Sequence, residues 1–281
     1  MSSVPGFLRK AMPPPPAPKG PVKCGSFGLA LQGAAWKYEL QHDRPDTVLL
    51  WITRGQGRVI VNGVRRGLSM HSALFLPAGT LFSVELPNTA QALYLECPAA
   101  LTGRLPHEPM HLRIRDSLAQ AELTGTLDTI QRELSQRRPF FDEAIEGHVG
   151  LLGVWLNRQV AAGNLDQGED SAATRLARRF AQSVTRDFRT PNAMALYAEA
   201  LDVTPTHLTR VCRQTCGKTA ADILTERKLH AARLALLAPQ PPVSRIARDL
   251  GFASAAYFTR FIQNHTGQTP TALRARARPR T

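Results

Sequence analysis

The sequence predicts an α+β multidomain protein, in which short strands come first and helices follow. Between residues 27 and 97, β-branched and apolar runs alternate with turns. Between residues 118 and 160, and again from residue 172 onwards, apolar residues recur at steps of three or four, which is typical of amphipathic helices. The 281 residues suffice for two domains, and 43% hydrophobic content allows each a packed core.

Five runs in the first hundred residues are expected to be strands of a sandwich or small barrel. Asn62-Gly63 is the strongest signal among them, because this pair favours the tight turn of a two-residue hairpin. The expected strands are Thr47–Thr53, Arg58–Val61, Ala73–Leu76, Leu81–Leu86 and Ala92–Cys97.

Two amphipathic helices are predicted next, over Leu118–Leu134 and Asp142–Val160. Their apolar stripes could be buried on the strands or on a second copy of the chain. Residues 164–171 are polar and predict a linker.

The remaining residues predict seven helices. Asn192 and Thr204 have the positions of N-caps, and Gly217, Gly251 and Gly267 those of C-caps. The expected helices are Ala172–Phe188, Ala193–Leu201, Pro205–Gln214, Ala220–Leu237, Val243–Leu250, Ser254–Gln263 and Pro270–Arg274.

The positive charge is concentrated in this last part. Residues 1–170 hold 17 Lys/Arg and 16 Asp/Glu, whereas residues 171–281 hold 18 Lys/Arg and 6 Asp/Glu, out of a net charge of +13. An arginine-rich genome would raise the charge everywhere, so the asymmetry favours a nucleic-acid-binding end. No apolar run is long enough to span a membrane, and four scattered cysteines fit a reducing, cytoplasmic location.

The basic part contains an internal repeat about fifty residues apart. Ala198–Val203 resembles Ala247–Phe252, and Leu208–Val211 resembles Phe258–Phe261. Each unit reads as a short helix, a tight turn and a second helix, which is a helix-turn-helix. The second helix of such a unit can lie in the major groove of double-stranded DNA.

Side chains on the outer stripe of each second helix are the candidate DNA contacts. Arginine can fork onto guanine or phosphate, whereas alanine can touch only a thymine methyl group, so the second unit should read less sequence. An ordinary ion pair within the domain is the alternative for Arg210 and Arg260. The candidates are Thr206, Thr209, Arg210 and Arg213, then Ala255, Ala256, Tyr257 and Arg260.

Residues 172–281 resemble the DNA-binding domain of the AraC/XylS family of transcription regulators. The resemblance rests on Leu208–Arg213, Arg227–Leu237 and Gly251–Phe261, followed by Gly267-Gln268-Thr269-Pro270. Cys212 and Leu273 stand where the family usually has aromatic residues. The resemblance implies a sequence-specific DNA-binding regulator, usually an activator that works with RNA polymerase, and a probable homodimer.

Residues 27–97 resemble, more weakly, the cupin-like barrel that precedes this domain in many family members, through Leu50–Gly57 and Leu74–Gly79. A cupin enzyme needs clustered metal ligands. Only His42 and His71 are present, on different strands, and Thr80-Leu81-Phe82 follows the turn where histidine is common. We therefore expect no metal, no cofactor and no enzyme activity.

The resulting division has a Pro-rich arm (1–23), a cupin-like sensor or dimerisation barrel (24–110), linker helices for dimerisation (111–163) and the DNA-binding domain (172–281). A small-molecule effector could bind in the barrel, although the same aromatic residues could be ordinary core. The candidate effector contacts are Trp36, Tyr38, Trp51, Arg58, Phe75, Phe82 and Tyr94.

Two other functions compete with a regulator. One is a cupin-type enzyme with an accessory DNA-binding domain, although no catalytic motif supports it. The other is an architectural protein that binds DNA without sequence preference. Cys212 and Cys216, near His207, are expected to be core residues rather than a metal site.

Overall fold

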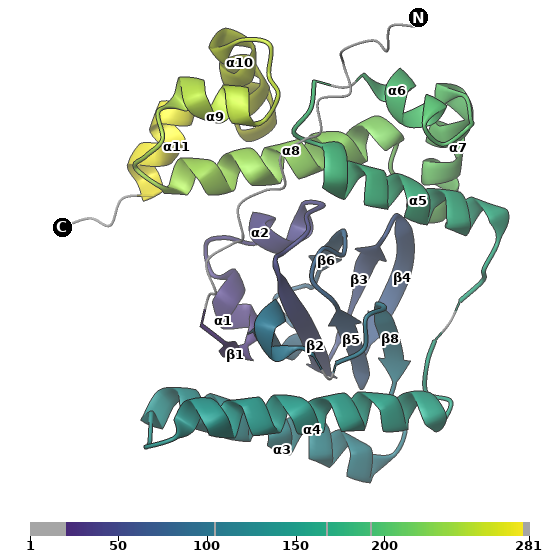
Figure 1. Ribbon diagram of the computed structural model, residues 1–281, viewed down its shortest axis with the longest axis vertical. Helices are drawn as coiled ribbons and strands as arrows, with labels where there is room; N and C mark the ends of the chain where they lie inside the picture. Colours follow the sequence, from purple (N-terminus) through teal and green to yellow (C-terminus); the bar gives the residue numbers. More distant parts are fainter. Residues whose placement is uncertain (1–20, 104, 167, 192, 278–281) are drawn as a thin grey trace, which may run out of the picture.

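The structure is a computed structural model that describes residues 21–103, 105–166, 168–191 and 193–277, so most of the Pro-rich arm lies outside it. Figure 1 shows three layers, with α3 and α4 on one side, the strands in the middle and the helices of the basic part on the other side. The two helical layers thus cover opposite sides of the strands.

The strands form two antiparallel sheets, with the orders β1-β7-β2-β5-β8 and β4-β3-β6. Of the two expected architectures, a sandwich or a small cupin-like barrel, the sandwich fits these sheets better, because they do not close into one barrel. The two sheets enclose an apolar core that includes Val48, Leu50 and Phe82. The strands are β1 (Lys23–Ser26), β2 (Asp46–Arg54), β3 (Gln56–Val61), β4 (Val64–Ser69), β5 (Ser72–Leu76), β6 (Phe82–Glu85), β7 (Gln91–Pro98) and β8 (Met110–Arg113).

The Asn62-Gly63 hairpin forms as predicted. Val61 pairs with Val64 across the turn. Asn62 and Gly63 both have positive φ angles, 47° and 73°, which are typical of the turn that matches the twist of two strands. The hairpin points toward the basic part, where a Cβ on Gly63 would lie only 3.1 Å from the backbone oxygen of Ala177.

Helices α3 (Ser117–Gln136) and α4 (Phe141–Ala161) bury their apolar stripes on the outer face of the five-stranded sheet. Leu123, Leu127 and Ile130 of α3 join Leu49 and Trp51 of β2 in one core. Of the two partners that the sequence left open for these stripes, the sheet is therefore the one they contact.

Within the described residues of the basic part there are seven helices, as predicted: α5 (Ala172–Asp187), α6 (Met194–Glu199), α7 (Pro205–Cys216), α8 (Ala220–Leu237), α9 (Val243–Asp249), α10 (Ala255–Thr266) and α11 (Pro270–Ala277). Thr204 caps α7 as predicted, and Gly217 and Gly267 end α7 and α10 with φ angles of 81° and 69°. Leu250, not Gly251, is the C-cap of α9, and Asn192 lies outside the described residues.

Several short elements were not predicted, because three to five residues carry too little periodicity: β1, β8, α1 (Phe27–Leu31), α2 (Trp36–Glu39) and the turn η1 (Ala99–Leu101). The predicted linker also has structure at its start. Arg113 donates its backbone N–H to Asn164, and Asp166 donates to His111, so residues 164–166 continue the edge of the five-stranded sheet.

Candidate DNA-binding surface

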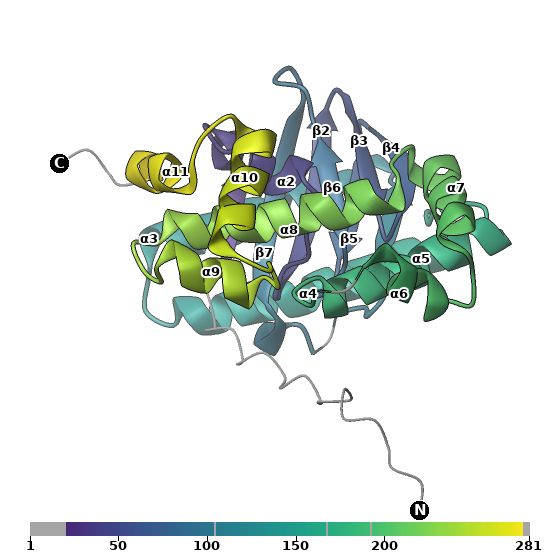
Figure 2. The same ribbon diagram turned by 90° about the horizontal axis from the view of Figure 1, so that it is seen from above.

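Two helix-turn-helix units lie at the two ends of α8. The first consists of α6 and α7, and the second of α9 and α10. Figure 2 shows α8 as a rod with α7 near one end and α10 near the other. The repeat in the sequence therefore corresponds to two separate units joined by one long helix.

Side-chain caps define where each second helix begins. The Thr204 hydroxyl accepts a hydrogen bond from the backbone N–H of His207 at 3.1 Å, and Pro205 follows at the first helical position. In the second unit the Ser254 hydroxyl accepts from the N–H of Tyr257 at 3.1 Å. Both helices thus begin directly after a residue whose side-chain hydroxyl caps the helix N-terminus.

Small and apolar residues hold the units together, as the sequence predicts. Ala198 and Ala247 are buried, which lets the paired helices cross closely, and Leu208 and Phe258 are wholly buried beside them. Cys212 fills the core position where the family usually has an aromatic residue, and burial raises the pKa of its thiol to about 12. Cys216 is buried too and donates its thiol to the Cys212 carbonyl, so both cysteines are core residues.

The candidate DNA contacts lie on the outer side of these helices. In the first unit Thr206, Arg210 and Arg213 are exposed and Thr209 is half-buried. In the second unit all four candidates are exposed: Ala255, Ala256, Tyr257 and Arg260. The first set shares one face of α7, whereas Ala255, Ala256 and Tyr257 are consecutive and spread around the exposed side of α10, with Arg260 one turn beyond Ala256. Contact with DNA remains a prediction.

The arginines of this surface form no ion pair among the residues that the structure describes, although Asp222 lies near enough to Arg213 for the two charges to interact. Arg210 contacts only the ring of His207, at 3.1 Å, and neither Arg213 nor Arg260 forms an ion pair there. The alternative of an ion pair within the domain is thus not what these side chains form. An exposed cation without an acid nearby is available to a phosphate or a guanine.

A buried clamp, missed at the sequence level, joins α8 to the strand domain. Arg227 of α8 is 7% exposed; its Nε lies 2.5 Å from Oδ1 of Asp43, and its guanidinium stacks on Phe188. His230, one turn further on, stacks on His42 with ring centroids 4.3 Å apart. These residues meet only through tertiary contacts, so no sequence motif predicts the clamp.

The two stacked rings of the clamp are neutral. Burial lowers the pKa of His230 to about 3, and nearby Arg227 adds to the effect. Burial likewise holds the pKa of His42 well below its usual value. The Nε2 of His230 lies 3.1 Å from the backbone oxygen of Lys37, which ties α8 to α2.

The candidate effector residues occupy different environments. Trp51 packs toward α3 and donates its indole N–H to Thr124, while Phe75 and Phe82 are wholly buried. Tyr38 donates its hydroxyl to Glu96 at 2.5 Å, and Tyr94 packs edge-on near Phe27. Most of these aromatic side chains therefore fill cores, and two other residues line cavities.

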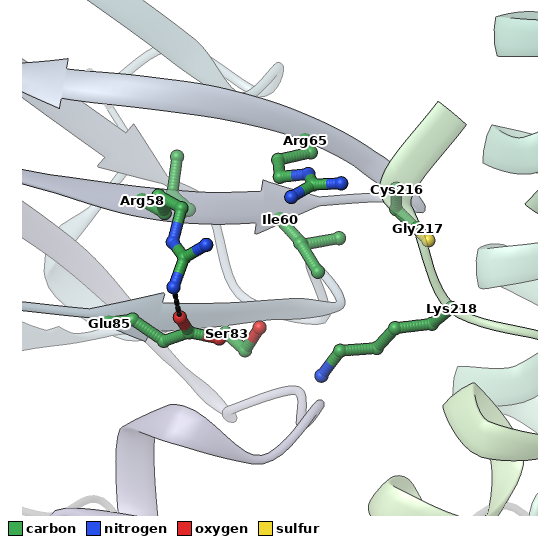
Figure 3. Close-up of a pocket in the computed structure, with 9 residues that line it drawn as sticks. Arg58, Ile60, Arg65, Ser83, Glu85, Cys216, Gly217 and Lys218 are labelled. Atoms are coloured by element: carbon green, nitrogen blue, oxygen red, sulfur yellow. Dashed lines mark ion pairs between the residues drawn. The ribbon is translucent and has the colours of Figure 1, made fainter. Parts of the chain in front are cut away.

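Arg58 and Trp36 are those two. Arg58 pairs with Glu85 at 2.9 Å on the wall of a 160 Å³ cavity that Lys218 closes from the other domain (Figure 3). Trp36 lines a 740 Å³ groove, and the guanidinium of Arg233 lies over its ring at 4.1 Å. Both cavities lie where the strands meet the helical part.

Arg65 also lies at the boundary between the two parts, beside Lys218 (Figure 3). A Cβ on Gly217, at the end of α7, would lie 2.5 Å from Nη2 of Arg65. The positive charge of Arg65 is stabilised here by the negative, C-terminal end of the α7 dipole. The hairpin of the strand domain thus contacts the first unit where its second helix ends.

Nothing in the described residues resembles a catalytic metal centre, since no group of three or more His, Cys, Asp or Glu there could hold an ion. His42 and His71 lie in separate places, against His230 and Trp51 respectively. Within the same residues, no helix combines the length and the apolar character that crossing a membrane requires.

Comparisons with known proteins agree with this geometry. Residues 197–276 match the family described as "Helix-turn-helix domain". HTH-type transcriptional activator RhaR of Escherichia coli (strain K12) is 23% identical over 249 residues, which cover 84% of this chain and 86% of that protein. RhaR of Shigella flexneri is similar to the same extent.

Two solved structures are also similar, with TM-scores below 0.5. Unsaturated fatty acid bound wild-type ToxT from Vibrio cholerae strain SCE256 is 12% identical, with 90% of this chain and 94% of that chain covered and a TM-score of 0.44. The C-terminal domain of AraT, a response regulator from Geobacillus stearothermophilus, is 27% identical over 40% of this chain and 92% of its own, with a TM-score of 0.36. Residues 197–276 thus form a helix-turn-helix domain, and along most of its length the chain is similar to DNA-binding transcription regulators such as RhaR, in line with the resemblance to the AraC/XylS family.

Proposed function

We propose that α7 and α10 are the recognition helices and that they enter successive major-groove segments on one side of the DNA, about 34 Å apart. The observation that carries the proposal is the set of exposed arginines that form no ion pair among the described residues, on helices whose other faces are buried in the domain core. Thr206, Thr209, Arg210 and Arg213 read bases or phosphates in the first unit. Ala255, Ala256, Tyr257 and Arg260 mainly anchor the second.

Selection of a binding site from random duplexes, followed by competition at fixed salt, tests this proposal. A sequence-specific regulator should prefer its site over random duplex by at least about a thousandfold. An architectural DNA binder would show no such preference, and that outcome would overturn the proposal. The salt must stay constant, because phosphate contacts make every affinity salt-dependent.

The chain acts as a homodimer in this proposal, with α3 and α4 as the contact. Leu118, Leu151 and Val154 are exposed on these helices, although their neighbours on the same helices pack against the sheet. Light scattering should give the mass of two 30.8 kDa chains, and Leu151→Lys should give one. A monomeric wild type would remove dimerisation from the proposal.

The groove beside Trp36 is the proposed effector site. Arg233 contributes a half-buried cation without an acidic partner in the described part of the chain, and Phe27, Leu31 and Val84 add apolar walls. Burial lowers the pKa of this guanidinium, and Glu39, which also lines the groove, forms no ion pair with it. The groove therefore fits a small amphipathic acid, and Arg233→Gln should abolish its effect on DNA affinity.

Transcriptional activation with RNA polymerase in the cytoplasm completes the proposal, in line with the activator RhaR. The competing function, a cupin-type enzyme with an accessory DNA-binding domain, gains no support from the ligands present. Metal analysis of the purified protein separates the two. Stoichiometric iron, manganese or zinc would favour the enzyme.

A further inference from the structure

A second cavity, of 330 Å³, lies where the β3–β4 hairpin, β8, residues 165–166 and α5 meet. It is separate from the groove at Trp36 and shares no lining residue with it. Val61, Leu74, Met110 and Leu165 contribute apolar wall. The volume falls at the lower end of the range of ligand pockets in proteins, so the cavity suits a small molecule.

The charged side chains around this cavity are already paired, several of them at an exposed rim, and the Asp166 carboxylate is shared by Arg66 at 3.7 Å and Arg113. The carboxylate of Asp166 lies 2.9 Å from Nη2 of Arg113, and the Arg66 guanidinium donates to the Asp166 carbonyl at 3.0 Å. Arg178 pairs with Asp170 at 2.8 Å. Glu108, the remaining charged residue of the wall, is exposed to water. An added charge would find no free counter-ion inside, so a charged ligand would lose its hydration without repayment.

The neutral ring of His111, in contrast, has nitrogen atoms that form no hydrogen bond within the described part of the chain. The side chain of His111 is only 4% exposed, and neither ring nitrogen has a hydrogen-bond partner among the described residues. Its Nδ1 lies 3.3 Å from Asp166 Oδ2, but burial outweighs that carboxylate and lowers the pKa of the ring to about 4. His111 is therefore neutral near pH 7, and a buried polar atom without a partner is costly.

We propose that this cavity binds an uncharged small molecule whose hydroxyl or amide group bonds to His111 and whose apolar side lies on Val61 and Leu165. The amide of Gln182, at the exposed rim on α5, offers a second polar contact. A neutral imidazole can donate or accept, which suits either a hydroxyl or an amide group.

The position of the cavity connects its occupant to the DNA-binding domain. Its walls come from the hairpin of the strand domain, from the ordered start of the linker and from α5. An occupant would bridge these three parts and hold α5 against the hairpin. This regulatory consequence rests on the proposed function, whereas the binding itself does not.

Nuclear magnetic resonance of the full chain, labelled in its histidine rings, tests the binding without DNA. The probes are benzamide and cyclohexanol, and their charged counterparts of similar size are benzoate and cyclohexylamine. We expect the neutral probes at millimolar concentration to shift the His111 ring signal, assigned by its loss in His111→Phe. The charged probes should leave it in place. No shift with either neutral probe, or equal shifts with the charged ones, would overturn the proposal.

Gln182→Trp provides a second variant, in case His111→Phe does not fold. This position is exposed on α5, so a bulky side chain can block the rim without disturbing the core. We expect it to weaken benzamide binding at least about tenfold, which corresponds to 1.4 kcal/mol. Arg179→Trp, exposed on the same helix and absent from the cavity wall, should not change it. Equal losses in both variants would contradict the assigned site, and DNA affinity measured on the same samples tests the proposed function separately.

Discussion

Asp43→Ala removes the only acid that contacts Arg227 among the described residues, and so leaves a buried guanidinium without a counter-charge. The Arg227 side chain is 7% exposed and that of Asp43 is 22% exposed, so the pair is largely, though not wholly, removed from water. Breaking a buried ion pair by removing one partner typically costs 3–5 kcal/mol. Because water reaches Asp43, we expect the lower end, about 3 kcal/mol of unfolding free energy.

The cost should come from the stranded charge rather than from lost packing. The double variant Asp43→Ala/Arg227→Met tests this, because methionine keeps the length of the side chain and its contact with Phe188 without the charge. A buried ion pair replaced by apolar groups is often neutral in stability. We therefore expect the double variant to unfold within about 1 kcal/mol of the wild type.

Urea unfolding of the full chain, followed by circular dichroism at fixed salt, measures both effects. Asp249→Ala is the matched control, because it breaks an exposed Arg–Asp pair, Arg245–Asp249 at 3.8 Å, which should contribute at most about 0.5 kcal/mol. The reasoning is refuted if Asp43→Ala costs no more than this control. It is equally refuted if the double variant is as unstable as the single one.

Three further predictions concern DNA reading, the helix ends and pH. Arg210→Ala should cost about 1–3 kcal/mol of DNA-binding free energy and relax the preference at one base position. An unchanged set of selected sites would show that Arg210 does not contact a base. Gly217→Ala should cost more stability than Gly267→Ala. Both helix ends need a positive φ, which costs alanine about 1 kcal/mol. Only at Gly217 does the new Cβ displace Arg65 as well. Equal losses of stability in the two variants would show that the contact with Arg65 does not stabilise the fold. Stability should fall as the pH drops from about 6.5 towards 4, because the unfolded chain protonates His230, His111 and His42, whereas burial lowers the pKa of the folded rings, to about 3 for His230 and about 4 for His111. The slope should approach 1.4 kcal/mol per pH unit for each ring, and urea midpoints of His230→Gln should show a flatter dependence than the wild type.

Much of the helical part could be read directly from residue types. Thr204, Pro205, Gly217 and Gly267 mark helix ends through local chemistry, which needs no information from elsewhere in the chain. The spacing of Leu208 and Arg210 assigns one to the core and the other to solvent, because helical geometry alone separates them. The candidate DNA surface was therefore accessible from sequence.

The strand domain was less accessible, since pairing between distant strands depends on the whole sheet. The Asn62-Gly63 turn was predictable, but the choice between a sandwich and a small barrel was not, nor was the order of the strands in the two sheets. Trp51 and Phe75 illustrate the difficulty. The sequence pattern of a strand is the same whether its aromatic residue faces a ligand or, as here, the core shared with α3 and α4.

The sequence by itself determined the basic charge of residues 171–281, the two helix-turn-helix units and the resemblance to the AraC/XylS regulators, because these follow from composition and from contacts near in the chain. Only the tertiary structure decided which buried polar groups meet. Asp43 and Arg227 are 184 residues apart, and His111 acquires its unfilled bonding capacity only when β8 closes against the linker and α5. Burial creates the energetic significance of such groups, and burial is a property of the folded chain rather than of any segment of it.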